Sequence, residues 1–481
     1  MRLSSITVEN YRSIEKDTIK NDEINGSYTY TLIGINESGK SSFLKAISLK
    51  DTEETPLYPQ DFCDTEKPIE LTFDYSLSTK EAKQIKEKAT ELGLPKELLN
   101  KVSISKVILK VIFPPNNADF QEKAELEIKD NIFSEYTNNG TAIVKKDGTE
   151  GQEDFNLKAF LEDKLQNIFF EMSHQTVFWK SESKYLITEP INLDEFAANP
   201  ETISIPLRNC FELAGVINVQ NEINKIKADP AEMHNLQEKL GKKVTEHIKS
   251  VWPGHPIKIR FQISGTTLTF LVEDDGVEYK AKVTAQRSDG FRQFVSFLLT
   301  VSAESNNGKL SDSILLLDEP ETHLHPKGQE NLRDELIKIT KNGNNNVAIF
   351  ATHSNYMIDK NYIDRCYRVV KEDNKTTRLN QFKNTETSYS EVNYVVFDIP
   401  TNDYHNELYG FLEDTDKPKL EGLEQSLTWK NEKTKQDENV SLPKYIRNQI
   451  HHPENTKNKK FTPDELVRSI KILRKLKYGK E

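Results

Sequence analysis

Near the start of the chain, a strand-like apolar segment leads directly into a glycine-rich loop with a lysine and a serine. The motif G-x-x-x-x-G-K-S runs from Gly34 to Ser41, and a helical pattern follows it. In this setting the glycines let successive backbone N–H groups converge on a phosphate at a helix N-terminus. We expect Lys40 to lie along the β- and γ-phosphates and the Ser41 hydroxyl to bind Mg²⁺. The predicted nucleotide contacts are Gly34, Asn36, Glu37, Ser38, Gly39, Lys40, Ser41 and Ser42.

Two adjacent carboxylates follow a second apolar strand. Ser313 to Leu317 is a buried-strand run that ends in Asp318 and Glu319. In a parallel sheet such a strand delivers its C-terminal residues beside the phosphate loop. We expect Asp318 to support Mg²⁺ and Glu319 to polarise the attacking water as a general base.

Three further residues are candidates for the same site. The buried-strand run 347–351 ends before His353, which can reach the γ-phosphate. Gln60 follows the loop helix, where a glutamine would reach the metal or the attacking water; the alternative is an ordinary loop amide. Arg12 is a candidate nucleotide contact or, alternatively, a surface residue. These residues predict catalytic roles for Glu319, His353 and Gln60.

The segment 287–293 reads RSDGFRQ and opens a helix. Ser288 is a sound N-cap with Gly290 in the first turn, so a simple helix start explains the pattern without a function. The four motifs nevertheless occur in order along the chain, which favours a nucleotide-related role for this segment too.

Composition narrows the class of protein. The chain has 481 residues, which predicts two or three domains, and a net charge of −11, which argues against a surface generally coated by nucleic acid. Its three cysteines lack metal or disulfide spacing, as is typical of a reducing cytoplasm. No apolar run is long enough to cross a membrane and the N-terminus alternates like a strand, so we expect a cytoplasmic protein without a membrane partner.

The set GINESGKSS, RSDGFRQ, LLLDEPETHLHP and FATHS resembles the ABC-type ATPase heads of the SMC, RecF and OLD group. The resemblance implies ATP and Mg²⁺ as cofactors and a head-to-tail homodimer. In that dimer Ser288, Gly290 and Arg292 of one subunit would close over ATP on the other. RSDGFRQ departs from the strict leucine-serine-glycine-glycine-glutamine signature. The EPETHLHP form is similar to OLD-like and anti-phage defence ATPases such as those of PARIS and Septu.

The expected fold is therefore α/β, an ABC-type P-loop ATPase head with a mixed sheet, an α+β insertion and a helical tail. The expected segments are 1–63 and 252–395 for the two halves of the head, 64–251 for the insertion and 396–481 for the tail. Within the insertion, the helical range 218–252 should break at Asp229-Pro230. Its apolar stripe of Leu236, Leu240, Val244 and Ile248 packs inside the chain or, alternatively, dimerises.

The tail carries no TOPRIM nuclease pattern, and we expect four short helices, at 403–413, 419–429, 442–452 and 463–477. Arg447, Asn448 and His452 fit the R-N-x-x-x-H pattern of HEPN ribonucleases, where arginine and histidine act on an RNA phosphate. A degenerate docking bundle and an unrelated tail are the alternatives, because these residues also suit a helix C-terminus.

The segment 456–481 holds nine Lys or Arg against three acidic residues and favours a basic helix that contacts nucleic acid or, alternatively, a solvated helix face.

Three hypotheses follow for the whole protein. The leading one is an ATP-hydrolysing sensor or scaffold in anti-phage defence that controls a separate effector protein encoded nearby. The second is a self-contained, ATP-gated HEPN-like ribonuclease. The third is a RecF-like DNA repair ATPase, which the short insertion and the acidic net charge place last.

Overall fold

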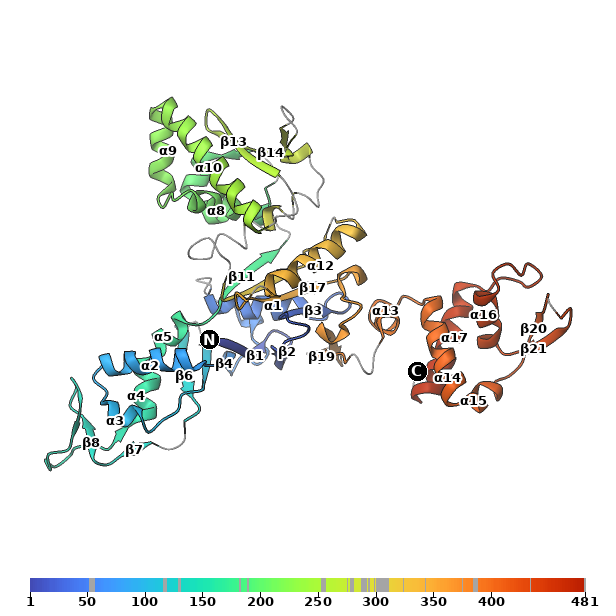
Figure 1. The fold of residues 1–481 in the computed structure, drawn as a ribbon, viewed down its shortest axis with the longest axis horizontal. Coiled ribbons are helices and arrows are strands. Elements are labelled where there is room, and N and C mark those ends of the chain that lie inside the picture. Colours follow the sequence, from blue (N-terminus) through green and yellow to red (C-terminus); the bar gives the residue numbers. More distant parts are fainter. Residues whose placement is uncertain are drawn as a thin grey trace. The chain divides into compact units, whose positions relative to one another are not determined.

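The computed structural model divides the chain into two compact units, Met1–Gln381 and Phe382–Glu481, which are described separately (Figure 1). The second unit begins earlier than the expected start of the tail at residue 396. The structure describes residues 1–51, 57–115, 119–128, 131–180, 183–187, 190–251, 257–274, 276, 281–286, 292, 295–297, 299, 311–322, 324–341, 343–373, 375–383, 388–432 and 434–479.

A mixed sheet forms the centre of the first unit. Among the described residues it has six strands, in the order β11 (Gln175–Lys180), β16 (Ser313–Asp318), β17 (Val347–Thr352), β3 (Thr29–Ile33), β18 (Cys366–Glu372) and β19 (Thr376–Gln381). The first five strands are parallel and β19 is antiparallel. Every residue of β3, β16 and β17 is buried, so the apolar runs predicted as buried strands are confirmed.

Two helices cover opposite faces of this sheet. Successive residues of a strand point to opposite sides, so each strand contributes side chains to both faces. Ile314 and Leu316 share a core with Phe43 and Leu44 of α1 (Lys40–Ser48). Leu315, Leu317 and Phe350 share another core with α12 (Pro326–Lys341) through Leu332 and Leu336. The buried runs are therefore apolar throughout, since both of their faces are covered.

A second, antiparallel sheet completes the head. Its order is β2 (Ile14–Lys20), β1 (Arg2–Tyr11), β4 (Ile69–Ser76), β5 (Lys106–Phe113) and β6 (Gln121–Leu126). The range 64–251 was expected to be an insertion, but it supplies β4 and β5 to this sheet and β11 to the central one. Alternating apolar residues predict a strand without identifying the strand that it pairs with.

The remaining elements of the first unit belong to neither of these two sheets. They are η1 (Leu49–Asp51), η2 (Pro59–Asp61), α2 (Thr79–Glu91), α3 (Lys96–Leu99), β7 (Ile132–Phe133), β8 (Tyr136–Asn138), β9 (Ile143–Lys145), β10 (Phe155–Asn156), α4 (Leu157–Lys164), α5 (Gln166–Glu171), η3 (Ser183–Tyr185), β12 (Ile191–Asn192), α6 (Leu193–Ala198), α7 (Pro200–Ile203), α8 (Ile205–Leu213), α9 (Val219–Ala228), α10 (Pro230–Val251), β13 (Ile257–Ser264), β14 (Thr267–Asp274), β15 (Lys282–Val283), η4 (Thr284–Gln286), η5 (Asn355–Met357) and η6 (Ile363–Arg365).

The predicted helix break at Asp229-Pro230 is confirmed, since it separates α9 from α10. The apolar stripe of α10 is buried within its own chain and packs against the β13–β14 hairpin. Dimerisation through this stripe is therefore excluded, because the surface that it would use already covers the unit's own strands.

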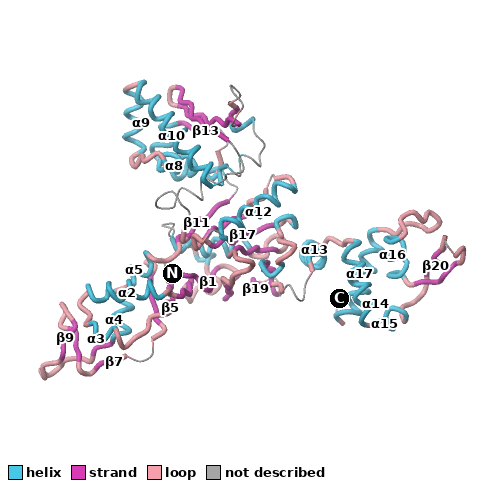
Figure 2. Tube along the Cα trace, in the orientation of Figure 1, coloured by secondary structure: helices cyan, strands magenta, loops and turns pink. Residues whose placement is uncertain are grey.

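The second unit is mainly helical, with one short hairpin in its described part (Figure 2). Its elements are α13 (Tyr389–Phe397), α14 (Asn402–Thr415), α15 (Lys417–Glu421), β20 (Leu427–Lys430), β21 (Asp437–Val440), α16 (Leu442–His451) and α17 (Pro463–Tyr478). The helix expected at 419–429 is wrong in its second half, where Trp429 lies in β20 and packs on Tyr445. Thr462 caps α17, and its side chain accepts the Glu465 N–H. No described helix has the length and apolarity to span a membrane.

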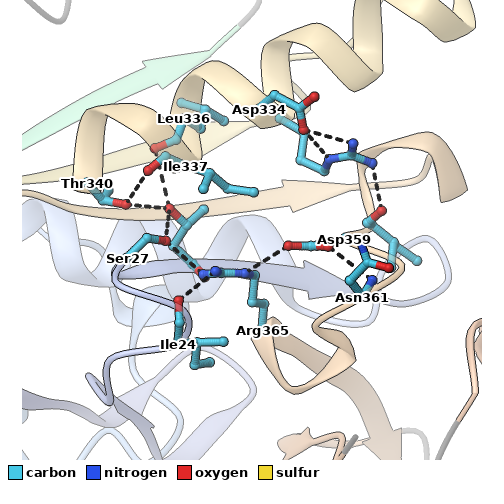
Figure 3. A network of polar contacts seen from close by, with 12 residues as sticks. Ile24, Ser27, Asp334, Leu336, Ile337, Thr340, Asp359, Asn361 and Arg365 are labelled. Carbon is cyan, nitrogen blue, oxygen red and sulfur yellow. Dashed lines mark hydrogen bonds and ion pairs between the residues drawn. The ribbon is translucent and has the colours of Figure 1, made fainter. Parts of the chain in front are cut away.

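A buried arginine fixes the strand that leads into the glycine-rich loop (Figure 3). Arg365 is 2% exposed and donates to the Ile24 carbonyl (2.6 Å), the Ser27 hydroxyl (2.8 Å) and Asp359 Oδ2 (3.1 Å). Behind it, the hydroxyls of Thr29 and Thr340 lie 2.8 Å apart and connect β3 to α12. The chain before β3 is thus held by a charge that has no access to water.

Replacing Arg365 by Met should therefore destabilise the first unit strongly. We expect a loss of about 3 to 5 kcal/mol, because Asp359 loses its buried partner and the acceptors at Ile24 and Ser27 lose their donor. Urea denaturation followed by fluorescence measures this loss in the free energy of unfolding. The control is Arg378→Met, which removes a half-exposed arginine paired with Glu15 and should cost about 1 kcal/mol or less. Equal losses would contradict this role.

Candidate active site

The glycine-rich loop lies against neighbouring backbone so closely that side chains are excluded at two positions. A Cβ at Gly34 would lie 2.4 Å from the Val369 carbonyl oxygen, and one at Gly39 would lie 2.4 Å from Thr377 Oγ1. Gly39 also has a φ of 108°, which L side chains rarely adopt. The motif glycines therefore fulfil the predicted structural role of a tightly folded loop.

Thr377 on β19 holds this loop from outside, and the sequence analysis did not identify it. Its buried hydroxyl donates to the Ser38 carbonyl at 3.0 Å and lies 2.8 Å from Ser13 Oγ. Its N–H donates to the Ser13 carbonyl at 2.7 Å. A lone threonine on an antiparallel strand has no local signal, because its role arises only from strand pairing.

The inner side of the loop suits a phosphate. Lys40 is 4% exposed, and its ammonium donates to the carbonyls of Gly34 (2.9 Å) and Ile35 (3.0 Å). The buried Ser38 hydroxyl has no hydrogen-bond partner among the described residues. Helix α1 begins after Gly39 without a side-chain cap, which leaves its first N–H groups for an anion. Asn36 and Glu37 are exposed on the outer part of the loop, and Ser42 is half-buried.

The predicted metal ligands meet across the sheet. Ser41 donates its hydroxyl to Asp318 Oδ1 at 2.8 Å, although 277 residues separate them. Burial raises the pKa of Asp318, while the Ser41 hydrogen bond acts in the opposite direction. A hydroxyl and a carboxylate are the oxygen donors that Mg²⁺ accepts when phosphates and water complete its shell. These two side chains therefore fit the metal that the motif implies.

The predicted general base, Glu319, and His353 also lie close together. His353 Nε2 lies 3.2 Å from Glu319 Oε1, and both side chains are partly exposed. Burial lowers the pKa of His353, and the Lys40 charge lowers it further, which favours the neutral imidazole. Glu319 has a left-handed φ of 51°, and its N–H donates to the Ala351 carbonyl at 3.0 Å. Such backbone strain is typical of functional turns.

A second carboxylate, Glu321, supports the histidine and was not predicted. Its Oε1 accepts hydrogen bonds from the His353 backbone N–H at 3.1 Å and from the Thr352 hydroxyl. Its Oε2 is buried without a partner among the described residues. Burial raises the pKa of Glu321. The Ser354 N–H in turn donates to Thr352 Oγ1 at 2.9 Å. Glu321 therefore fixes the backbone that carries His353.

The structure places the two other predicted residues differently. Arg12 donates its Nε–H to Asp61 Oδ1 at 3.0 Å and lines a pocket that also contains Ser41 and Asp318. Gln60 is exposed in η2 and is not among the described residues lining that pocket. Lys180, at the end of β11, is paired in register with Asp318 and lines the same pocket. Parallel strand pairing, which the local sequence does not reveal, decides this placement.

The predicted signature can be located only in part. Ser288 and Gly290 lie outside the described residues, and Arg292 is helical, with its carbonyl accepting the Ser296 hydroxyl.

The tail motif lies on the last turn of α16. Arg447 pairs with Glu413 (3.2 Å) and stacks over the Tyr409 ring, 5.2 Å from its centre. His452 is exposed at the helix C-cap, where its N–H donates to the Asn448 carbonyl at 2.8 Å. Arg447 and Asn448 thus contribute to the packing and end of this helix.

The comparisons with known proteins agree with this geometry. A family model described as AAA ATPase domain matches residues 1–358. The chain is 28% identical over 137 residues to the uncharacterized protein MJECL43 of Methanocaldococcus jannaschii, which is 27% of this chain and 35% of that protein. It is 28% identical over 82 residues to the Old nuclease of Escherichia phage P2, which is 17% of this chain and 14% of that protein. The chain therefore spans about a third and a seventh of these relatives.

The solved structures that match this chain include SMC heads. The SMC head domain from Thermotoga maritima has a TM-score of 0.37 at 11% identity and covers 80% of this chain and 100% of its own. An SMC head bound to the C-winged helix domain of ScpA has a TM-score of 0.40 at 12% identity, covering 80% and 99%.

A glycine-rich loop after β3, carboxylates after β16 and a histidine after β17 define a P-loop ATPase. The chain belongs to the AAA ATPase domain family. The predicted α/β fold of a P-loop ATPase head with a mixed central sheet is confirmed, and the predicted resemblance to OLD-like proteins has a counterpart in the local match to the Old nuclease.

Glu321 should act on catalysis through His353. We expect Glu321→Ala to lower kcat for ATP hydrolysis by about 10- to 100-fold with little change in ATP affinity, because a displaced group slows the step without removing a nucleotide contact. Glu321→Gln keeps the Oε1 acceptor and should retain most of the rate. Steady-state kinetics and ATP titration separate the two quantities. An alanine variant with wild-type kcat would show that Glu321 is dispensable.

Lys40 should make ATP binding depend on pH. Burial lowers its pKa to about 8, against the opposing charges of Glu319, Asp318 and Glu321. Triphosphate charge raises the pKa again, so above pH 8 binding must return a proton to the lysine. We expect affinity to fall by up to about tenfold per pH unit between pH 8 and 10.

Calorimetry in two buffers of different ionisation enthalpy should detect uptake of close to one proton at pH 9 and almost none at pH 7. Lys40→Met is the control, since its residual binding should show no uptake in this window. Equal uptake by wild type and Lys40→Met would assign the proton to another group.

Proposed function

We propose that this ATPase hydrolyses ATP to ADP and phosphate and uses the cycle to control a separate effector protein, in the setting of anti-phage defence. The observation that carries the proposal is the pairing of His353 with Glu319 beside the Ser41–Asp318 pair. A turn with a purely structural role would need neither the strained Glu319 backbone nor a histidine that is held both through its ring and through its backbone N–H. The defence setting rests on the resemblance of the EPETHLHP segment to OLD-like and anti-phage defence ATPases, and the chain also has a local similarity to the Old nuclease of phage P2.

The residues divide the reaction among them. The loop N–H groups and Lys40 bind the phosphates, and Ser41 and Asp318 would hold Mg²⁺, which supplies charge neutralisation between the β- and γ-phosphates when it is bound. Glu319 polarises the attacking water, and neutral His353 orients the Glu319 carboxylate and contacts the γ-phosphate. Glu321 keeps the His353 backbone in place during this step.

Dimerisation would complete the site. In the proposed head-to-tail homodimer, Ser288, Gly290 and Arg292 of a second copy close over the nucleotide, so that ATP holds two heads together and hydrolysis releases them. The effector would read this change through the helical second unit, where the C-terminal helix α17 presents Arg468, Lys471 and Lys475 on its exposed side. None of these three forms an ion pair with a described residue, so an acidic protein surface or nucleic acid suits this face.

The nuclease and the RecF-like alternatives have less support. The Arg447 guanidinium is already paired with Glu413, which lowers its capacity for an RNA phosphate. A DNA repair role predicts ATPase activity stimulated by DNA, and the chain has a net charge of −11.

Glu319→Gln tests the proposed function. We expect the variant to bind ATP, to lose hydrolysis by at least about 100-fold, and to accumulate as an ATP-bound dimer, because the amide cannot accept a proton from water. Single-turnover hydrolysis and light scattering with ATP measure the two effects. Glu87→Gln, an exposed change on α2, is the matched control. Wild-type hydrolysis by Glu319→Gln would refute the base assignment, and a variant that traps ATP as a monomer would refute the dimer.

A further inference from the structure

A pocket of 650 Å³ lies along the outer side of α1, between this helix, β11 and α8. Ser41, Lys45 and Ser48 line it from α1, where their spacing places them on one helix face. Thr176, Phe178 and Lys180 line it from β11. The pocket reaches the metal ligands Ser41 and Asp318 at one end, but Gly34 to Lys40 do not line it. It is therefore continuous with the ATP site without being the space that the triphosphate fills.

The pocket is basic in a chain that is acidic overall. Of the described residues that line it, five are cationic and two are acidic: Arg12, Lys45, Lys180, Lys184 and Arg208 against Asp51 and Asp318. The chain as a whole has a net charge of −11. Arg12 is paired with Asp61 at 3.0 Å and Arg208 with Glu201 at 3.3 Å, both outside the lining. The lysines of the pocket repel one another, and a bound anion would offset that repulsion.

The two acidic residues do not supply that anion. Asp51 is held by Lys50 Nζ at 2.8 Å and by the Thr176 N–H at 2.6 Å, and Asp318 accepts the Ser41 hydroxyl. In contrast, neither Lys45 nor Lys184 forms an ion pair with a described residue. Lys184 instead lies over the Tyr185 ring, 5.0 Å from its centre. The pocket thus has cationic capacity that its own carboxylates leave unused.

We propose that this pocket binds a second ligand, a compact group of two or more phosphates, beside the nucleotide held by the phosphate loop. The volume is in the range of small-molecule sites and holds an oligophosphate. Lysine and arginine from several directions match phosphate oxygens, and Phe178 and Tyr185 offer apolar contact to an attached base. Occupancy would place negative charge next to Lys180 and Asp318. Through these residues the ligand regulates the metal side of the ATP site, a role beyond the proposed function.

Full-length Lys40→Ala protein isolates this site, because the phosphate loop then lacks its lysine. We expect calorimetry to show binding of inorganic tripolyphosphate to this variant. Adding Lys45→Glu and Lys184→Glu should weaken that binding about tenfold or more. The matched control adds Lys83→Glu and Lys164→Glu instead, which makes the same charge change at exposed lysines outside the pocket and should weaken binding less than twofold.

Two outcomes would overturn the proposal: no binding of tripolyphosphate to Lys40→Ala protein with an unchanged melting temperature, or equal weakening of binding by the pocket pair and the control pair of substitutions.

The source of the phosphates is decided by comparing the binding of a 5′-triphosphorylated oligonucleotide with that of its unphosphorylated form. Phosphate-dependent binding of the oligonucleotide at least as tight as that of tripolyphosphate assigns the pocket to a nucleic-acid end, and weaker binding assigns it to a free nucleotide or oligophosphate. The Glu319→Gln dimer experiment does not involve Lys45 or Lys184, so failure of either idea is recognisable.

Discussion

The parallel register of β11, β16, β17 and β3 is the constraint on which the site depends. Parallel strands end at the same edge of a sheet, so the residues that follow each strand are brought together however far apart they lie in the chain. Ser41 and Asp318 meet at 2.8 Å and Glu319 and His353 at 3.2 Å for this reason. Burial of both faces of these strands fixes the register, since any slip would expose part of two cores.

The same edge concentrates polar groups in a poorly hydrated place. Lys40 and Glu321 are both nearly fully buried, and burial shifts the pKa of each toward its neutral form. Such groups are costly without partners, and the structure supplies most of them from the backbone: two carbonyls for Lys40 and the His353 N–H for Glu321. The Ser38 hydroxyl is buried without a partner among the described residues, and it lies in the loop where a phosphate would bind.

Control of the ATPase would depend on charges outside the four motifs. The P-loop centre contains both signs in close pairs, whereas the neighbouring pocket and the exposed face of α17 are predominantly basic. In a chain with a net charge of −11, these two regions stand out as places where anionic ligands or partners would be favoured. Thr377 and Arg365 show that positioning also depends on residues remote from the loop in sequence.

The sequence by itself determined the chemistry and the local elements. The phosphate loop, the carboxylates after β16, His353, the break at Asp229-Pro230 and the cap at Thr462 all depend on neighbours within a few residues, so local spacing is sufficient to predict them. Only the tertiary structure decided that Lys180 lies beside Asp318, that Thr377 and Glu321 support the loop and the histidine, and that the α10 stripe is internal. These outcomes depend on which strands pair and which faces they cover, and alternation along one segment carries no information about its distant partner.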